Sequence, residues 1–129
     1  MLIAALLATA LLFGGMVLYS FGFAAFIFTA LPTEIAGQTL RRAFPHFYTF
    51  VIAAAAAAAA LLYRADPVAA GLMLLVLATS LPTRQLLMPA INRATDAGAR
   101  LQFKLLHSLS VGITLAHIGI TGFVLSRFA

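Results

Sequence analysis

The chain has 129 residues, of which 64% are hydrophobic and 9% charged, whereas soluble domains carry about 25% charged residues. Its formal net charge is +5, but the basic residues are scattered, and no basic face with interleaved aromatic side chains indicates a nucleic-acid partner. Cysteine is absent, which excludes disulfides, thiolate metal sites and cysteine nucleophiles. We therefore expect a polytopic membrane protein, an all-α four-helix bundle in which residues 1–129 form a single transmembrane domain.

The first apolar stretch, residues 2–31, carries no charge and ends where Pro32 provides turn chemistry. About 20 apolar residues are enough to cross a hydrocarbon core of about 30 Å. A helix of this length must therefore tilt, kink or project beyond the core, and the Gly14-Gly15 pair marks the expected soft point.

The second span is predicted over residues 46–63, directly after Pro45. It contains eight consecutive alanines, at positions 53–60. Small side chains allow helix backbones to approach closely in lipid, so we expect this helix in the interior of the bundle.

The third span is predicted over residues 68–88 and is opened by Pro67, which the first turn of a helix tolerates. The short connection before it makes the second and third spans antiparallel neighbours, and Pro82 predicts a kink. Residues 92–104 form the most polar stretch, long enough for an interfacial turn or a helical extension. The fourth span, residues 105–128, follows immediately.

Basic residues are distributed unequally between the two sides of this topology. The side of both termini and the second connection holds Arg64 and Arg127, and the other side holds six basic residues. Because Lys and Arg concentrate on cytoplasmic loops, we expect a multi-pass protein of the cell inner membrane with both termini outside the cytoplasm. The six residues are Arg41, Arg42, Arg84, Arg93, Arg100 and Lys104.

Polar side chains recur along the fourth span at spacings of three, four, three and four residues. At about 100° per residue they fall within an arc of about 80° on one helix face. Small side chains occupy a flanking face, a pattern that favours close helix contact, so we expect the polar stripe to face the bundle interior. The stripe consists of His107, Ser110, Thr114, His117 and Thr121, and the small face of Ser108, Gly112, Ala116 and Gly119.

Two interpretations of the stripe stay open. Intramembrane polar side chains are costly and often mark a ligand site or an ion path. Serine and threonine also bond to their own helix carbonyls or across helices, in which case the stripe only holds the bundle together. On the first interpretation the ligand-binding residues are His46, Arg84, His107, Ser110, Thr114 and His117.

A haem-b redox protein is the alternative function. His46 and His107 each begin a predicted span on the same side, so they can lie at similar depth and act as axial ligands. Arg42 or Arg84 would then lie near the propionates. Ordinary interfacial histidines explain the same pattern, because two histidines without further ligands specify no cofactor. His107 and His117 lie about 15 Å apart along one helix, which excludes a shared metal ion.

Catalytic signatures are missing from the sequence. The three acidic residues, Glu34, Asp66 and Asp96, all fall in predicted connections, so no pair of carboxylates lies within the spans for acid–base chemistry. The sequence has no glycine-rich phosphate loop, no His-Glu-x-x-His motif and no serine nucleophile elbow. This pattern favours a protein that is not an enzyme.

Several short motifs carry a family resemblance. Met88-Pro89-Ala90-Ile91-Asn92 is followed by a Phe-x-x-x-His-x-x-Ser pattern at Phe103, His107 and Ser110, and Gly14-Gly15, Phe44-Pro45 and Phe47-Tyr48 precede it. Together they resemble the transmembrane-protein-205-like family. The resemblance implies a small four-span membrane protein whose biochemical activity is poorly defined. Thr114 departs from that pattern, which has an asparagine one heptad after the histidine.

We therefore expect an integral inner-membrane protein that binds or passes a small ligand through its polar face or acts as an accessory subunit. Its expected partners are the lipid bilayer and either a second copy or another membrane protein. A purely structural partner is a third interpretation, for which Gly14-Gly15, the alanine run and the small face would be association surfaces.

Overall fold

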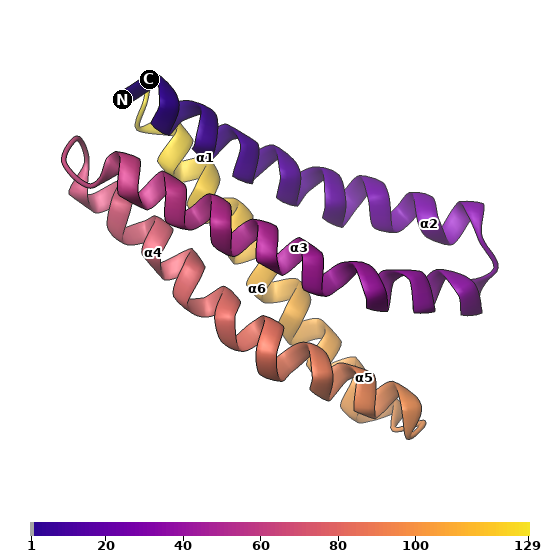
Figure 1. Cartoon of the computed structure of the whole chain (residues 1–129). Helices are drawn as coiled ribbons and strands as arrows, with labels where there is room; N and C mark the ends of the chain where they lie inside the picture. The colour runs from indigo at the N-terminus through magenta and orange to yellow at the C-terminus, as the bar shows by residue number, and fades with distance from the viewer. Residues whose placement is uncertain (1) are drawn as a thin grey trace.

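Four long helices joined by short turns make up the structure, a computed structural model that describes residues 2–129 (Figure 1). They are Leu2–Ala30, Thr33–Leu62, Pro67–Asp96 and Arg100–Ser126, and no strand occurs among these residues. Each helix has 27 to 30 residues and is apolar enough to cross a membrane. At about 1.5 Å per residue such helices are about 40–45 Å long, which matches a bilayer including its headgroup regions. The expected all-α four-helix bundle is confirmed.

The first long helix keeps α-helical geometry at Gly14-Gly15 and changes to π-helical geometry a few residues later. It consists of α1 (Leu2–Val17), the π-helical segment η1 (Leu18–Phe23) and α2 (Ala24–Ala30). Gly15 lies directly against the second long helix, because a Cβ there would be 2.6 Å from the Phe50 ring. The glycine therefore permits close helix packing, and the departure from α-helical geometry that we expected at this pair occurs at η1 instead.

The second long helix, α3 (Thr33–Leu62), begins well before residue 46, where the span is predicted to start. Pro45 lies inside the helix instead of before it. The Pro45 carbonyl accepts hydrogen bonds from Thr49 Oγ1 at 2.9 Å and from Arg84 Nε at 3.1 Å. Proline lacks the N–H that would bond to the Arg41 carbonyl, and packing against neighbouring helices allows a membrane helix to continue through such a gap.

The third and fourth long helices are separated by a single tight turn. The third comprises α4 (Pro67–Pro82), the π-helical segment η2 (Thr83–Leu87) and α5 (Met88–Asp96), and the fourth is α6 (Arg100–Ser126). The irregularity expected at Pro82 is present as η2, which starts at the next residue. Gly98 makes the turn to α6 with a φ of 66°, a conformation that suits glycine.

Helix α3 lies at the centre of the bundle, in contact with α1 on one side and α4 on the other. It is the most buried of the four long helices, as its alanine run predicts. Ala55 and Ala58 are completely buried, whereas Ala57 on the opposite face is exposed. Helix α6 packs on α1, α4 and α5 and is the least buried.

The two ends of the bundle differ. The chain termini meet at one end, and at the other end two pairs of helices diverge (Figure 1). The first arm is α2 with residues 33–44 of α3, and it has a small core of its own around Ile27, Ala36 and Leu40. The second arm is α5 with residues 100–107 of α6. We refer to this end as the splayed end.

An ion pair closes the end at which the termini meet. Asp66 caps α4 by accepting a hydrogen bond from the Ala69 N–H at 3.1 Å. Its carboxylate also accepts from Arg127 Nε at 2.7 Å and Nη2 at 3.0 Å. The Arg127 guanidinium holds the pKa of the Asp66 carboxyl below its ordinary value of 3.8, so the pair is charged at neutral pH and fastens the C-terminus to the α3–α4 turn.

Candidate functional site

Polar side chains from all four long helices lie at a similar depth in the bundle. Three contacts place their helices in register: Tyr19 stacks on Phe47 with ring centroids 4.2 Å apart, and two hydrogen bonds join α4 to α6 and η2 to α3. These polar residues occupy about two helical turns, or about 10 Å of depth. They form the polar layer, which consists of Tyr19, Tyr48, Ser80, Thr83, Ser110, Thr114 and His117.

His117 provides the clearest contact between helices in the layer. Its side chain is 4% exposed, and its Nε2 lies 2.7 Å from Thr79 Oγ1 on α4. The Thr79 hydroxyl also lies 2.7 Å from the Leu75 carbonyl, to which it donates its single proton. Nε2 then carries a proton and donates it to Thr79, which holds the His117 ring across two helices.

Several hydroxyl groups of the stripe bond within their own helix. Ser110 donates to the His107 carbonyl at 2.8 Å, and Thr121 donates to the His117 carbonyl at 2.6 Å. On η2, Thr83 donates to the Thr79 carbonyl at 2.7 Å. These bonds match the structural interpretation of the stripe, and they leave oxygen lone pairs as acceptors towards the interior.

Two oxygen atoms of the layer have no hydrogen-bond partner. Tyr19 Oη and Ser80 Oγ are both buried and unpaired among the described residues. The Ser80 residue is completely buried, so bulk water does not reach its hydroxyl. Buried polar atoms are nearly always paired in proteins, and an exception requires an explanation such as a ligand, an ordered water or stored strain.

Both π-helical segments coincide with this layer. Tyr19 belongs to η1, and Thr83 is the first residue of η2. The π-helix is rare, occurs mostly as a local bulge within α-helices, and is frequent at functional sites. Two such segments on different helices, at the depth of two unpaired oxygens, make the polar layer the candidate functional site.

The predicted site residues separate into two groups. Arg84, Ser110, Thr114 and His117 lie in or beside the layer, with Arg84 directed to the Pro45 carbonyl. The other two predicted residues are exposed, and His107 stacks on Phe103 at a centroid distance of 5.4 Å. The polar stripe therefore faces the interior from Ser110 onwards, whereas its first residue, His107, is exposed. The residues that fall outside the layer are His46 and His107.

The haem hypothesis finds no support in this geometry. Axial ligation requires two imidazoles facing one iron across a cavity. His46 and His107 are both exposed, and neither lines a hollow described below. Residues 2–129 contain no group of three or more His, Asp or Glu side chains that could hold a metal ion.

Four residues of the layer are not among the predicted site residues. Tyr19 and Tyr48 belong to no periodic polar pattern on their spans, and Ser80 and Thr83, three residues apart on theirs, form only a short one. The one feature that marks all four is a hydroxyl within an apolar span. That feature indicates a shared site only when the relative depth of the helices is known.

Two hollows on the surface of the described residues lie outside the polar layer. A groove of about 410 Å³ lies between α3 and α4, and a smaller hollow of about 160 Å³ lies beside Asp66 and Arg127. The groove is lined by Ala56, Ala59, Ala60, Tyr63, Ala70 and Leu74.

Comparison with known proteins gives one match. Residues 7–100 match the family model described as a domain of unknown function, DUF4149. No curated protein and no solved structure matches the chain. The matched range includes nearly all of the first three long helices and ends where α6 begins, so it does not extend over the polar stripe.

Proposed function

The chain belongs to the DUF4149 family, whose function is unknown, and from that premise we propose that it is a non-enzymatic inner-membrane protein whose polar layer binds a small polar ligand. The observation that carries the proposal is the pair of buried, unpaired oxygens, Tyr19 Oη and Ser80 Oγ. An unsatisfied buried hydroxyl costs about 1–3 kcal/mol, so a ligand that pairs with both would gain from contacts the protein leaves open.

The charges around the layer favour a neutral or anionic ligand. Glu34, Asp66 and Asp96 all lie at helix ends, and Arg84 is the charged side chain beside the layer. A cation would enter a low-dielectric interior without a carboxylate to balance it, which is strongly unfavourable. We expect hydroxyl, amide or acidic groups in the ligand.

Access to the layer is most direct from the splayed end, where the two arms already diverge (Figure 1). A cysteine-free chain allows a direct test with single cysteines. We expect a cysteine at Ser80 to react with a small, water-soluble anionic thiosulfonate in native membranes. The matched control is Val76→Cys, one turn away on the same buried face of α4, which we expect to stay unreactive. Equal inertness at both positions would refute access to the layer.

Removal of an unpaired hydroxyl tests whether a ligand occupies the polar layer, because the sign of the stability change differs between the empty and the occupied layer. In a permanently closed layer, Tyr19→Phe removes an unsatisfied group and raises stability by about 1–3 kcal/mol. If a ligand from the native membrane pairs with the hydroxyl, the same variant unfolds at lower temperature than the wild type. We expect the second result in native membranes and the first after purification in detergent.

Association through α6 is a second candidate function, because its small face is exposed. Ser108, Gly112, Ala116 and Gly119 are all exposed, and a Cβ on either glycine would meet no other atom within 4 Å. In lipid, a face of small residues allows a partner helix to approach closely. This surface would suit an accessory subunit, and the resemblance to the transmembrane-protein-205-like family is compatible with either role.

A leucine on the small face should disrupt such an association. We expect Gly112→Leu to lower the yield of cross-linked complexes in native membranes, because the larger side chain holds the partner helix away. Gly71→Leu on α4 is the matched control, since that glycine is also exposed with no atom near its Cβ position. An unchanged cross-linking pattern in the Gly112 variant would exclude this face as the contact.

A further inference from the structure

The splayed end carries an excess of unpaired positive charge. Five basic residues lie there with only two acids, Glu34 and Asp96. Among residues 2–129, two ion pairs form, and only the one between Arg41 and Asp96 is at this end. Four exposed cations are left without an acidic partner in the described chain. These are Arg42, Arg93, Arg100 and Lys104.

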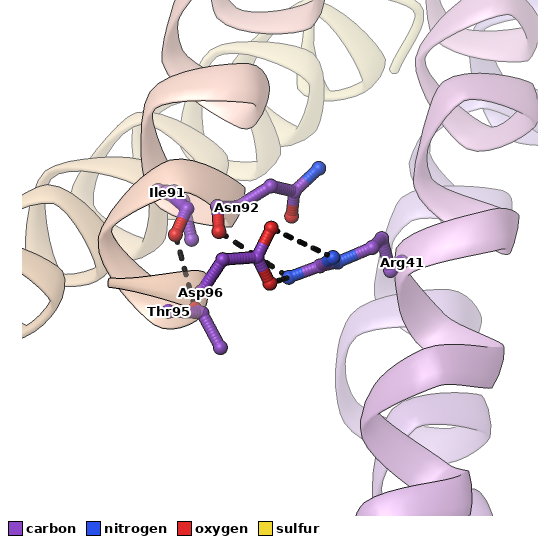
Figure 2. A network of polar contacts seen from close by, with 5 residues as sticks. All are labelled: Arg41, Ile91, Asn92, Thr95 and Asp96. Carbon is purple, nitrogen blue, oxygen red and sulfur yellow. Dashed lines mark hydrogen bonds and ion pairs between the residues drawn. The ribbon is translucent and has the colours of Figure 1, made fainter. Parts of the chain in front are cut away.

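Arg41 is the one side chain of the first arm that reaches the second arm in this network (Figure 2). Its Nη2 donates to Asp96 Oδ1 at 2.9 Å and to the Asn92 carbonyl at 3.3 Å, and its Nη1 lies 3.4 Å from Asp96 Oδ2. The guanidinium therefore holds a carboxylate in a two-point contact between the arms. A phosphate group offers the same spacing of acceptor oxygens.

The carboxylate in this contact is easily displaced. The Arg41 and Asp96 side chains are 37% and 66% exposed, and exposed ion pairs contribute little to stability. Asp96 is also the last residue of α5, where its negative charge meets the negative end of the helix dipole. A phosphate has no such penalty, because it is not part of the helix.

Apolar side chains accompany the free cations. Along the start of α6, exposed Leu101, Phe103 and Leu105 alternate with Arg100 and Lys104. Because the helices are about as long as a bilayer with its headgroups, this segment lies where headgroups meet acyl chains. Its side chains can therefore contact both parts of one phospholipid.

We propose that the splayed end is a binding site for an anionic phospholipid, whose phosphate replaces the Asp96 carboxylate on Arg41. The free cations supply the remaining positive charge, and the apolar residues of α6 contact the acyl chains. The ligand class follows from charge complementarity and from the position of the site at headgroup depth. This inference does not depend on a ligand in the polar layer.

The experiment uses the full chain in nanodiscs of phosphatidylcholine with a minor fraction of phosphatidylglycerol, and it measures the phosphatidylglycerol retained by native mass spectrometry. We expect Arg41→Gln to lower the apparent affinity roughly fivefold, because one basic residue near an anionic surface contributes about 1 kcal/mol. Asp96→Asn should raise retention, because it frees Arg41. Arg64→Gln, which removes one exposed cation at the opposite end, should retain as much lipid as the wild type.

The Asp96 variant separates this proposal from a purely structural ion pair. If Arg41 and Asp96 only hold the arms together, Asp96→Asn gains no phosphatidylglycerol, and the proposal fails. An equal loss in Arg64→Gln would mean diffuse charge attraction and would also overturn it. The same holds if inorganic phosphate displaces the retained lipid at millimolar concentration, since the site would then bind free anions. A gain in Asp96→Asn cannot result from misfolding, which keeps the test decisive.

Discussion

An Ala58→Leu substitution is expected to destabilise the bundle by about 1–3 kcal/mol, because it overfills a closely packed contact. Ala58 is completely buried on α3, the helix that lies between α1 and α4. In a soluble protein the extra apolar surface would offset part of this cost. In a membrane the unfolded helices remain in lipid, which solvates leucine as well as the bundle interior does. The steric cost of the larger side chain is therefore not offset.

The matched control for this prediction is Ala57→Leu. Ala57 belongs to the same alanine run but is exposed, so the larger side chain extends into lipid. We expect a change within about 0.5 kcal/mol, as for most surface substitutions. Reversible unfolding in mixed micelles of sodium dodecyl sulfate and a mild detergent measures both variants. Equal losses at the two positions would contradict the orientation of α3 in the bundle.

The number of helices and the place of α3 could be predicted from the sequence. A span requires only length and hydropathy, and close packing in lipid requires only small residues, so both can be found from composition along the chain. The start of α3 could not be predicted. Pro45 ordinarily marks a helix boundary, and here α3 continues through it beside η2, whose Arg84 bonds to the Pro45 carbonyl from a distant part of the sequence.

The candidate site was only partly predictable. The stripe on α6 follows helical periodicity, and its members from Ser110 onwards do face the interior. His107 does not: it lies near the start of α6, the least buried of the four long helices, and is exposed. Tyr19 and Ser80 join the layer only through the register of separate helices. Of the two π-helical segments, η2 follows Pro82, where an irregularity is expected, whereas η1 has no such signal in the sequence.

Cysteines placed in the two connections that flank the third long helix are expected to react from opposite sides of the membrane. Ala65 lies in the turn between α3 and α4, and Ala97 lies in the turn between α5 and α6, and both are exposed. Six basic residues accompany Ala97, so that turn should be cytoplasmic. Ala97 is preferred to Gly98, whose φ of 66° disfavours a side chain.

In intact cells, a membrane-impermeant maleimide should label Ala65→Cys fully and leave Ala97→Cys unlabelled until the cells are opened. The chain has no native cysteine, so each variant reports a single site without background. Ala129→Cys is the control, because the Asp66–Arg127 ion pair fastens the C-terminus to the Ala65 turn and both should label together. The reverse pattern would place the splayed end outside the cytoplasm, and the anionic lipid that we propose for Arg41 would then have to come from the outer leaflet.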